Sequence, residues 1–158
     1  MAVAVRWLLV LGVCLQSLSA CAGPLGVGDA VPAFVAKDQH GKEFVFTNSV
    51  RFLLVATERE SGTSANHKLA EQGAGFLEKH QAAYVMDIHT MPGVARLFAL
   101  PKMRKYPQRI VLVETAGMLA WVPTQAGRVT VLALTPAGRI QKISYWNPDS
   151  EPVEGCLQ

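Results

Sequence analysis

Short apolar runs separated by amphipathic stretches predict the backbone of the fold. Residues 52–56, 82–88 and 109–113 are mostly apolar runs with the length of a strand that is buried on both faces. In residues 64–80 and 92–106, apolar positions recur every three or four residues, which is the spacing of one face of a helix. Strands that alternate with helices predict an α/β fold with parallel strands at its centre.

Two hairpins are expected to flank this core. The turn Asp38-Gln-His-Gly41 separates two short extended pieces and predicts a β-hairpin at the entrance of the domain. Strands at 128–134 and 139–145 surround the turn Thr135-Pro-Ala-Gly138 and predict a second hairpin. The predicted fold class is therefore α/β, a three-layer fold with a central mixed sheet flanked by helices and an N-terminal β-hairpin.

The helices are predicted in more detail. The polar stretch Glu58 to Thr63 is expected to be a loop, and the next helix to begin at about Ser64 with Thr63 or Ser64 as its cap. The second helix contains Pro101, which should kink or split it. Its buried face is expected to hold Val94, Leu97, Phe98 and Met103. Its exposed face carries Arg96, Lys102, Arg104 and Lys105. A basic cluster of this kind is usually a solvated face, and it also suits anionic lipid headgroups or an acidic partner.

The first residues have the pattern of a secretion signal. A basic residue precedes an apolar core at 7–15, and residues 18–21, Leu-Ser-Ala-Cys, form a cleavage region. The apolar core is shorter than the roughly 20 residues that a membrane-spanning helix needs. Leu-Ser-Ala-Cys also resembles the bacterial lipobox, which predicts a lipid on Cys21. Ordinary cleavage after Ala22 is the alternative.

This signal divides the chain into segments. By resemblance to sorted lipoproteins, Ala22 after the cysteine favours an outer-membrane anchor in the bacterial cell envelope, with the protein facing the periplasm. Behind a signal peptide at 1–20, residues 21–29 contain three glycines and are predicted to be a flexible tether. Residues 30–146 are predicted to form the folded domain, and 147–158 an irregular C-terminal tail.

The chain contains three cysteines, so few thiols are available for redox chemistry. Cys14 is removed with the signal. If Cys21 carries a lipid, Cys156 is the only remaining thiol. If Cys21 is retained without a lipid, a Cys21–Cys156 disulfide would tie the two ends of the mature chain. The chain contains no Cys-x-x-Cys pair, and Cys156 in its polar tail is expected to be an incidental exposed thiol.

Length and charge favour one ordinary domain. The chain has 158 residues, of which 50% are hydrophobic, and its formal net charge is +3. A normal core can therefore form. The charge is small and scattered, without a run of Lys and Arg interleaved with aromatic residues, so the sequence does not predict a nucleic-acid partner.

Five short segments together resemble the thioredoxin superfamily, and most closely its peroxiredoxin and TlpA-like branches. The segments are Gly28–Phe34, Asp38–Lys42, Phe52–Val55, Val85–Asp87 and Val129–Gly138. They correspond to an opening Gly-Asp-x-x-Pro-x-Phe piece, an Asp-x-x-Gly-Lys turn, and a closing pair of strands around a turn glycine. A looser similarity links the chain to cysteine-poor periplasmic proteins of the YtfJ type. The resemblance implies a thioredoxin-like fold over most of residues 27–146.

The resemblance also shows what the chain lacks. Ala56-Thr57 matches the start of the Ala-Thr-Trp-Cys-x-x-Cys motif, but the two cysteine positions then fall on Arg59 and Gly62, or near Ser61 if the loop slips. Disulfide exchange needs a thiolate, which neither a guanidinium nor a hydroxyl replaces. The family's site would therefore bind without redox catalysis. Its candidate binding residues are Glu58, Arg59, Glu60, Ser61, Gly62 and Thr130, the last lying where thioredoxins have cis-Pro-Thr.

A hydrolase site or a metal site has less support from the sequence. Ser61 or Ser64 with His67 as base would need an orienting carboxylate and oxyanion donors as well. The four histidines do not have the spacing of a known metal site, and Asp87 with His89 is the one pair that a strand end would bring together. No cofactor, metal or catalytic residue is predicted.

The favoured function is a non-redox thioredoxin-fold lipoprotein that acts as a binding or scaffolding module, with an envelope protein as its expected partner. The alternative is a thiol-disulfide or peroxiredoxin-like antioxidant protein that works through a partner or through Cys156.

Overall fold

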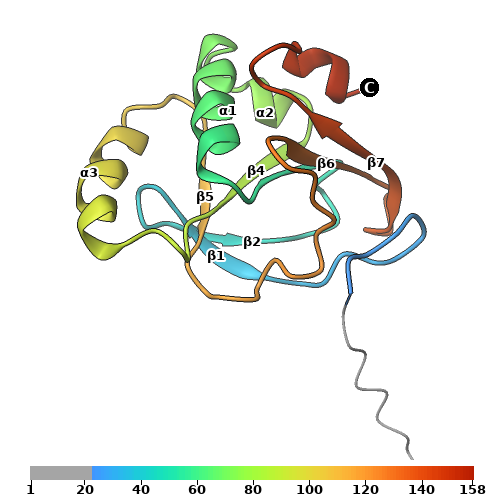
Figure 1. Ribbon diagram of the computed structural model, residues 1–158. Coiled ribbons are helices and arrows are strands. Elements are labelled where there is room, and N and C mark those ends of the chain that lie inside the picture. The colour runs from blue at the N-terminus through green and yellow to red at the C-terminus, as the bar shows by residue number, and fades with distance from the viewer. Residues whose placement is uncertain (1–22) are drawn as a thin grey trace, which may run out of the picture.

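A computed structural model describes residues 23–158, with a seven-stranded mixed sheet at their centre (Figure 1). The strands are β1 (Val35–Asp38), β2 (Glu43–Val45), β3 (Phe52–Ala56), β4 (Ala82–Asp87), β5 (Val111–Val113), β6 (Val129–Leu134) and β7 (Ile140–Trp146). Their order across the sheet is β2-β1-β5-β4-β3-β6-β7. The pairs β3–β4 and β4–β5 are parallel and the other pairs are antiparallel. The predicted α/β class and both hairpins are confirmed.

The predicted signal segment 1–20 and the proposed lipidation residue Cys21 lie outside the described residues. Within residues 23–158, no helix has the length and apolar character needed to cross a membrane.

All helices of the described chain lie on one face of the sheet. They are α1 (Arg59–Glu71), α2 (Phe76–Lys79), α3 (Gly93–Met103) and the short 3-10 helix η1 (Val153–Cys156). Their buried side chains, such as Leu69, Leu77 and Met103, share one core cluster with Tyr84 and Met86 of β4. Because successive strand residues point to opposite faces, alternate residues of β3 and β4 face this helical layer.

Helix α1 begins at Arg59, so the prediction of a loop over Glu58–Thr63 and of a helix from about Ser64 is wrong. Glu58 is the residue before the first turn, and its carbonyl oxygen accepts a hydrogen bond from the N–H of Gly62 at 3.0 Å. The Thr63 hydroxyl donates to the Arg59 carbonyl oxygen at 2.9 Å within the helix and caps nothing. The buried positions of the first turn are Ser61 and Gly62, which are small and not apolar, so its sequence has no apolar periodicity that would mark it as helical.

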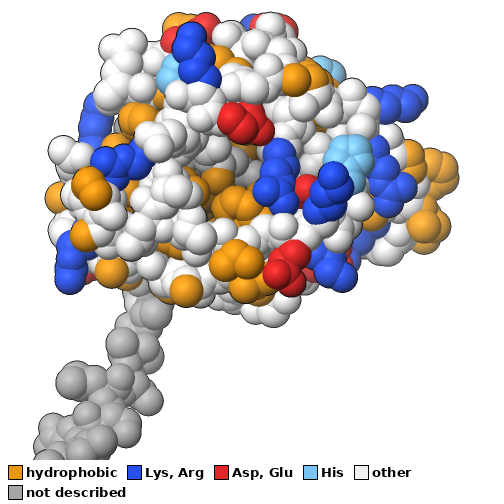
Figure 2. Space-filling model, turned by 180° about the vertical axis from the view of Figure 1, so that it is seen from behind, with side chains coloured by type: hydrophobic (Ala, Val, Ile, Leu, Met, Phe, Trp, Pro, Cys, Tyr) orange, Lys and Arg blue, Asp and Glu red, His pale blue; other side chains and the backbone are white. Residues whose placement is uncertain are grey.

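Helix α3 does not bury the face that its pattern predicts. Met103 is buried, but Val94, Leu97 and Phe98 are 69%, 71% and 75% exposed. Figure 2 shows hydrophobic side chains projecting at the right-hand edge, where α3 lies when the molecule is seen from behind. The spacing reveals an apolar stripe, but whether a stripe is covered depends on where the helix sits against the rest of the fold.

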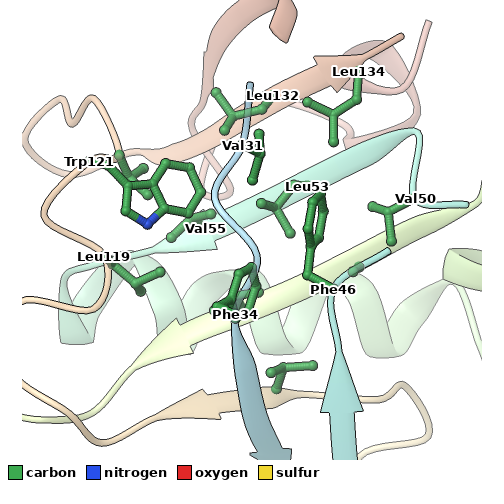
Figure 3. Close-up of a cluster of buried hydrophobic side chains, with 14 of the residues drawn as sticks. Val31, Phe34, Phe46, Val50, Leu53, Val55, Leu119, Trp121, Leu132 and Leu134 are labelled. Carbon is green, nitrogen blue, oxygen red and sulfur yellow. The ribbon is translucent and has the colours of Figure 1, made fainter. Parts of the chain in front are cut away.

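The other face of the sheet is covered by irregular segments instead of helices. Phe34 and Phe46 stack with ring centroids 5.5 Å apart, and Trp121 packs against Phe34 from the segment 114–127. Figure 3 shows these side chains directed toward Leu53 of the sheet. The third layer of the predicted architecture therefore consists of irregular segments, because the strands of the N-terminal hairpin belong to the sheet itself.

The described part of the predicted tether is bound to the domain, which corrects the expectation that residues 21–29 are flexible. The N–H of Leu25 donates to the Trp121 carbonyl oxygen and the N–H of Gly28 to that of Ile140, both at 2.8 Å. The Arg139 guanidinium donates to the Gly28 carbonyl oxygen at 2.9 Å. Gly28 has a φ of 96°, a backbone conformation that glycine adopts without strain.

The C-terminal tail, residues 147–158, packs onto the helical face. Val153 and Leu157 are 1% and 6% exposed and belong to the same core cluster as Trp146. The indole N–H of Trp146 donates to the Glu151 carbonyl oxygen at 2.9 Å. Apart from η1, the tail is irregular, but it adds to the core and is not a loose extension.

Candidate functional site

The candidate site lies at the carboxyl end of β3, where α1 begins. Of the six predicted binding residues, Glu58, Arg59 and Glu60 are exposed, and Ser61, Gly62 and Thr130 are buried. A ligand at this edge can therefore touch only the first three directly.

Glu58 and two of the buried residues hold this edge together. Glu58 Oε2 accepts a hydrogen bond from the N–H of Gly127 at 2.9 Å, which ties the start of α1 to the segment before β6. The Ser61 hydroxyl donates to the Glu58 carbonyl oxygen at 3.3 Å. The Thr130 hydroxyl donates to the Pro123 carbonyl oxygen at 2.6 Å. These polar groups are occupied with structural bonds. The peptide bonds of the described chain are all trans.

Gly62 stands where the resemblance places the second redox cysteine, and a side chain there would meet Met86. A Cβ added to Gly62 would lie 2.8 Å from Met86 Cε and 3.4 Å from Ala56 Cβ. On the other side of the residue, the Tyr84 hydroxyl donates to the Gly62 carbonyl oxygen at 3.1 Å. The thioether of Met86 thus fills the space next to the helix backbone, so a cysteine at this position would have to displace it.

A groove of about 400 Å³ opens between α1 and α3, beside this position. Its apolar lining residues are Met86, Met91, Ala95, Phe98, Ala99 and Met103. Its polar lining residues are Arg59, Thr63, Asn66, Lys102 and Tyr106. A volume of this size is within the range of small-ligand sites, which are mostly apolar with a few polar groups.

Two polar lining residues of the groove, Asn66 and Tyr106, are in turn contacted by Gln108 and His67. The Asn66 amide donates to Met86 Sδ at 3.8 Å, and its Oδ1 is buried without a hydrogen-bond partner among the described residues. The Gln108 side chain donates to the Asn66 carbonyl oxygen at 3.0 Å. The Tyr106 hydroxyl and His67 Nε2 are 3.3 Å apart. Burial raises the pKa of Tyr106, which keeps its phenol neutral.

Arg59 was predictable as a site residue from the sequence, but the α3 side of the groove was not. Of the groove residues from α3 and its approach, Phe98 and Met103 were assigned to a buried face and Lys102 to the exposed basic face, whereas Met91 and Ala95 were left unassigned. The apolar stripe of α3 was the available signal. It could not show that α3 stands apart from the first half of α1 and leaves a groove between them.

The structure does not bring a serine nucleophile and a histidine base together. The Ser61 hydroxyl bonds to the Glu58 carbonyl oxygen, whereas His67 pairs with Tyr106.

Asp87 and His89 do meet, as their position at a strand end predicts. His89 Nδ1 lies 2.7 Å from Asp87 Oδ1. Nevertheless, residues 23–158 contain no group of three or more His, Cys, Asp or Glu side chains placed to hold a metal ion.

Cys156 lies away from the candidate site. Its thiol is half-buried in η1 and donates to the Pro152 carbonyl oxygen at 3.9 Å. Burial, reinforced by the nearby Glu151 carboxylate, raises the pKa of Cys156 to about 11. The positive charge of Lys142 is near enough to oppose this shift in the pKa of Cys156. Lys142 pairs with Ala133 of β6, and Ala133 pairs with Phe52, the first residue of β3. The thiol therefore lies toward the opposite end of β3 from Arg59.

Two other hollows also lie toward the amino ends of β3 and β4. One of about 300 Å³ is lined by Gln81 and Arg109, and another of about 610 Å³ by Arg51 and Lys142. Neither includes a residue of the candidate site.

Comparison with known proteins identifies the fold. No family model matches the chain, and no curated protein matches it. Among solved structures, the thioredoxin domain of a thiol-disulfide oxidoreductase from Bacteroides vulgatus is 13% identical, with a TM-score of 0.55 over 85% of this chain and 99% of that chain. A peroxiredoxin-like protein from Aquifex aeolicus is 14% identical, with a TM-score of 0.55 over 86% of each chain. The peroxidoxin BcpB from Mycobacterium tuberculosis is 13% identical, with a TM-score of 0.53 over 83% of this chain and 93% of that chain. The thioredoxin-like fold is confirmed, and identities this low carry no chemistry with them.

Proposed function

We propose that this chain is a non-redox binding protein with a thioredoxin-like fold, and that its ligand occupies the groove between α1 and α3. The observation that carries the proposal is that Arg59 and Gly62 occupy the two positions where the resemblance places the redox cysteines. Arg59 opens the helix, Gly62 has no side chain, and a Cβ added at Gly62 would lie 2.8 Å from Met86 Cε. The open groove next to this closed position is available for binding.

The lining of the groove supports one class of ligand. Apolar side chains line most of it, and Arg59 and Lys102 are exposed cations that border it. An apolar group that ends in a negative charge would bury its apolar part between the helices and pair its charge with these two side chains. Such a group is found in amphipathic anions and in the C-terminal residue of a partner protein.

Anilinonaphthalene sulfonate, a flat apolar anion, is a suitable probe of the groove in the purified chain. We expect it to bind with increased fluorescence, and Ala95→Phe to weaken binding about tenfold because the new ring fills the groove. Arg59→Glu should weaken it by a similar factor through charge reversal. The matched controls are Ala74→Phe and Lys42→Glu, at exposed positions outside the groove. Both should bind the probe as the unaltered chain does.

Two results would contradict this proposal. One is equal loss of probe binding in the groove variants and in the controls. The other is turnover of insulin disulfides or hydrogen peroxide by the chain, at a rate that Cys156→Ser abolishes.

We also propose that the protein is anchored in the bacterial envelope through a lipid on Cys21, at the outer membrane and facing the periplasm. The Leu-Ser-Ala-Cys segment at 18–21 supports this. A second candidate function, thiol chemistry through Cys156 or a partner, is supported by the thiol-disulfide oxidoreductase and the peroxiredoxin-like protein that have the same fold.

Intact mass of the chain from its native membrane, with and without thiol alkylation, tests the anchor and the second candidate together. We expect a diacylglyceryl group on an amino-terminal Cys21 and one thiol that alkylates, Cys156. A mass without lipid and without an alkylatable thiol would reveal a Cys21–Cys156 disulfide. That result would overturn the anchor and favour thiol chemistry.

A further inference from the structure

We propose that the outward face of α3 is a membrane-contact surface that inserts into the headgroup region of an anionic phospholipid bilayer. This surface shares two side chains, Phe98 and Lys102, with the lining of the groove, whereas Val94, Leu97 and Lys105 lie outside that lining.

The first observation is an apolar stripe that nothing in the described chain covers. Leu97 and Phe98 follow Val94 by three and four residues, so the three side chains lie on one side of α3, and each is more than two-thirds exposed. Figure 2 shows hydrophobic side chains that stand out from the surface at the edge where α3 lies. Large apolar side chains grouped on one exposed helix face mark an interaction site.

The second observation is the charge around this stripe. Residues 88–113 contain no Asp or Glu, and five Lys and Arg residues. Arg96 is paired with Glu114, Arg109 with Asp38, and Arg104 donates to the Gln39 carbonyl oxygen.

Lys102 and Lys105 are the remaining cations of this segment. Both are exposed, and neither forms an ion pair with a described residue. They follow the apolar stripe at the C-terminal end of α3, and Figure 2 shows Lys and Arg side chains close to the projecting hydrophobic group. A surface with an apolar centre and free cations at one end complements a layer of anionic headgroups over acyl chains.

The shape of this surface favours a bilayer over a protein partner. A protein that covered the stripe would need a groove matched to three projecting side chains, whereas the headgroup region of a bilayer accommodates them without a preformed shape. The basic residues at the end of the stripe would remain in the headgroup layer, as Lys side chains at membrane interfaces do.

A tryptophan at position 98 reports insertion directly, even if the full chain is also held by a lipid anchor. Phe98→Trp in the full chain should show a blue-shifted emission, quenched by brominated acyl chains, with vesicles of equal parts phosphatidylglycerol and phosphatidylcholine. Vesicles of phosphatidylcholine alone should produce a much smaller response. The unaltered chain provides the background from the natural tryptophans, and Val45→Trp, at an exposed position in β2, is the matched control that should not respond.

Charge-reversal variants test whether the two lysines contribute to insertion in addition to the apolar stripe. Lys102→Glu with Lys105→Glu in the Phe98→Trp chain should weaken insertion about tenfold or more. The same double change at Lys42 and Lys142, which are also exposed, should leave it within about twofold.

Three results would overturn the proposal. One is an emission from the Phe98→Trp chain that anionic vesicles leave unchanged. Another is an equal response of this chain to both vesicle compositions. The third is a photo-crosslinker at Leu97 that captures a protein in the intact envelope while the Phe98→Trp chain shows no insertion, which would assign the surface to a protein partner.

Discussion

Replacement of Trp146 by alanine is expected to lower the free energy of unfolding by about 4 kcal/mol, within the range for a fully buried tryptophan. Trp146 is 0% exposed and ends β7, the strand from which the C-terminal tail departs. Its ring packs in one cluster with Val153 and Leu157, and its indole N–H donates to the Glu151 carbonyl oxygen. Alanine would leave a cavity and an unpaired carbonyl oxygen, and the tail would lose its main apolar support.

Urea unfolding of the two proteins measures this loss, and hydrogen exchange shows where it acts. Amide protection should fall most in residues 147–158, while β3 and β4 are affected only through global stability. Tyr145→Ala is the matched control, since Tyr145 is the preceding aromatic residue and is only partly buried. A loss for Trp146→Ala no larger than for this control, with an unchanged tail, would show that the tail is held by other contacts.

The strands were predictable because burial on both faces leaves a local trace. Residues 52–56 and 82–87 are apolar in every position but the last of β4, as central parallel strands tend to be. The turns at 38–41 and 135–138 were predictable for a different reason. Each contains a glycine with positive φ, Gly41 and Gly138, where a side chain would be strained.

The residue at which a helix begins, and the helix face that the rest of the fold covers, could not be predicted from local sequence. The first turn of α1 exposes Arg59 and Glu60 and buries only Ser61 and Gly62, so it has no large apolar side chain and the same composition describes a loop. The stripe of Val94, Leu97 and Phe98 has the spacing of a buried face, although α3 exposes it. In both cases the deciding fact is the position of the helix relative to distant strands, which local periodicity does not contain.

The candidate site also combines features that the sequence could predict with features that required the tertiary structure. The absence of cysteines at Arg59 and Gly62 could be seen in the sequence once the resemblance placed them. That Met86 occupies the space beside Gly62 depends on the parallel pairing of β3 with β4, which sets Met86 opposite Ala56. The groove itself, formed by α1 and α3 from separate parts of the chain, required the tertiary structure.

Replacement of Asp38 by alanine is expected to cost about 3 kcal/mol at neutral pH, because it removes three hydrogen bonds, one of them to a charged partner. Asp38 Oδ1 accepts hydrogen bonds from the N–H groups of His40 and Lys42, each at 2.9 Å. Its Oδ2 accepts one from Arg109 Nε at 2.9 Å, and the carboxylate is 4% exposed. The change would loosen the β1–β2 turn and leave the Arg109 guanidinium without its carboxylate partner, with the Glu43 carbonyl oxygen as its remaining hydrogen-bond acceptor.

The size of this loss should depend on pH. Burial alone would raise the pKa of Asp38, but the hydrogen bonds from Lys42 and His40 and the charge of Arg109 outweigh it, so the pKa lies below its ordinary value. A carboxylate with a lowered pKa stabilises the folded state fully above the unfolded-state pKa, and this contribution is lost as pH falls through the folded-state pKa.

The difference in unfolding free energy between the unaltered chain and Asp38→Ala should therefore be constant from about pH 8 to pH 5 and should shrink toward about pH 3. Urea unfolding across this range measures it, with Asp149→Ala, at an exposed position, as the matched control. A difference that stays the same at every pH would mean that Asp38 acts through the shape of the turn alone. A decrease confined to the acid range would show that its charge and the Arg109 pair hold the hairpin against the edge of the sheet.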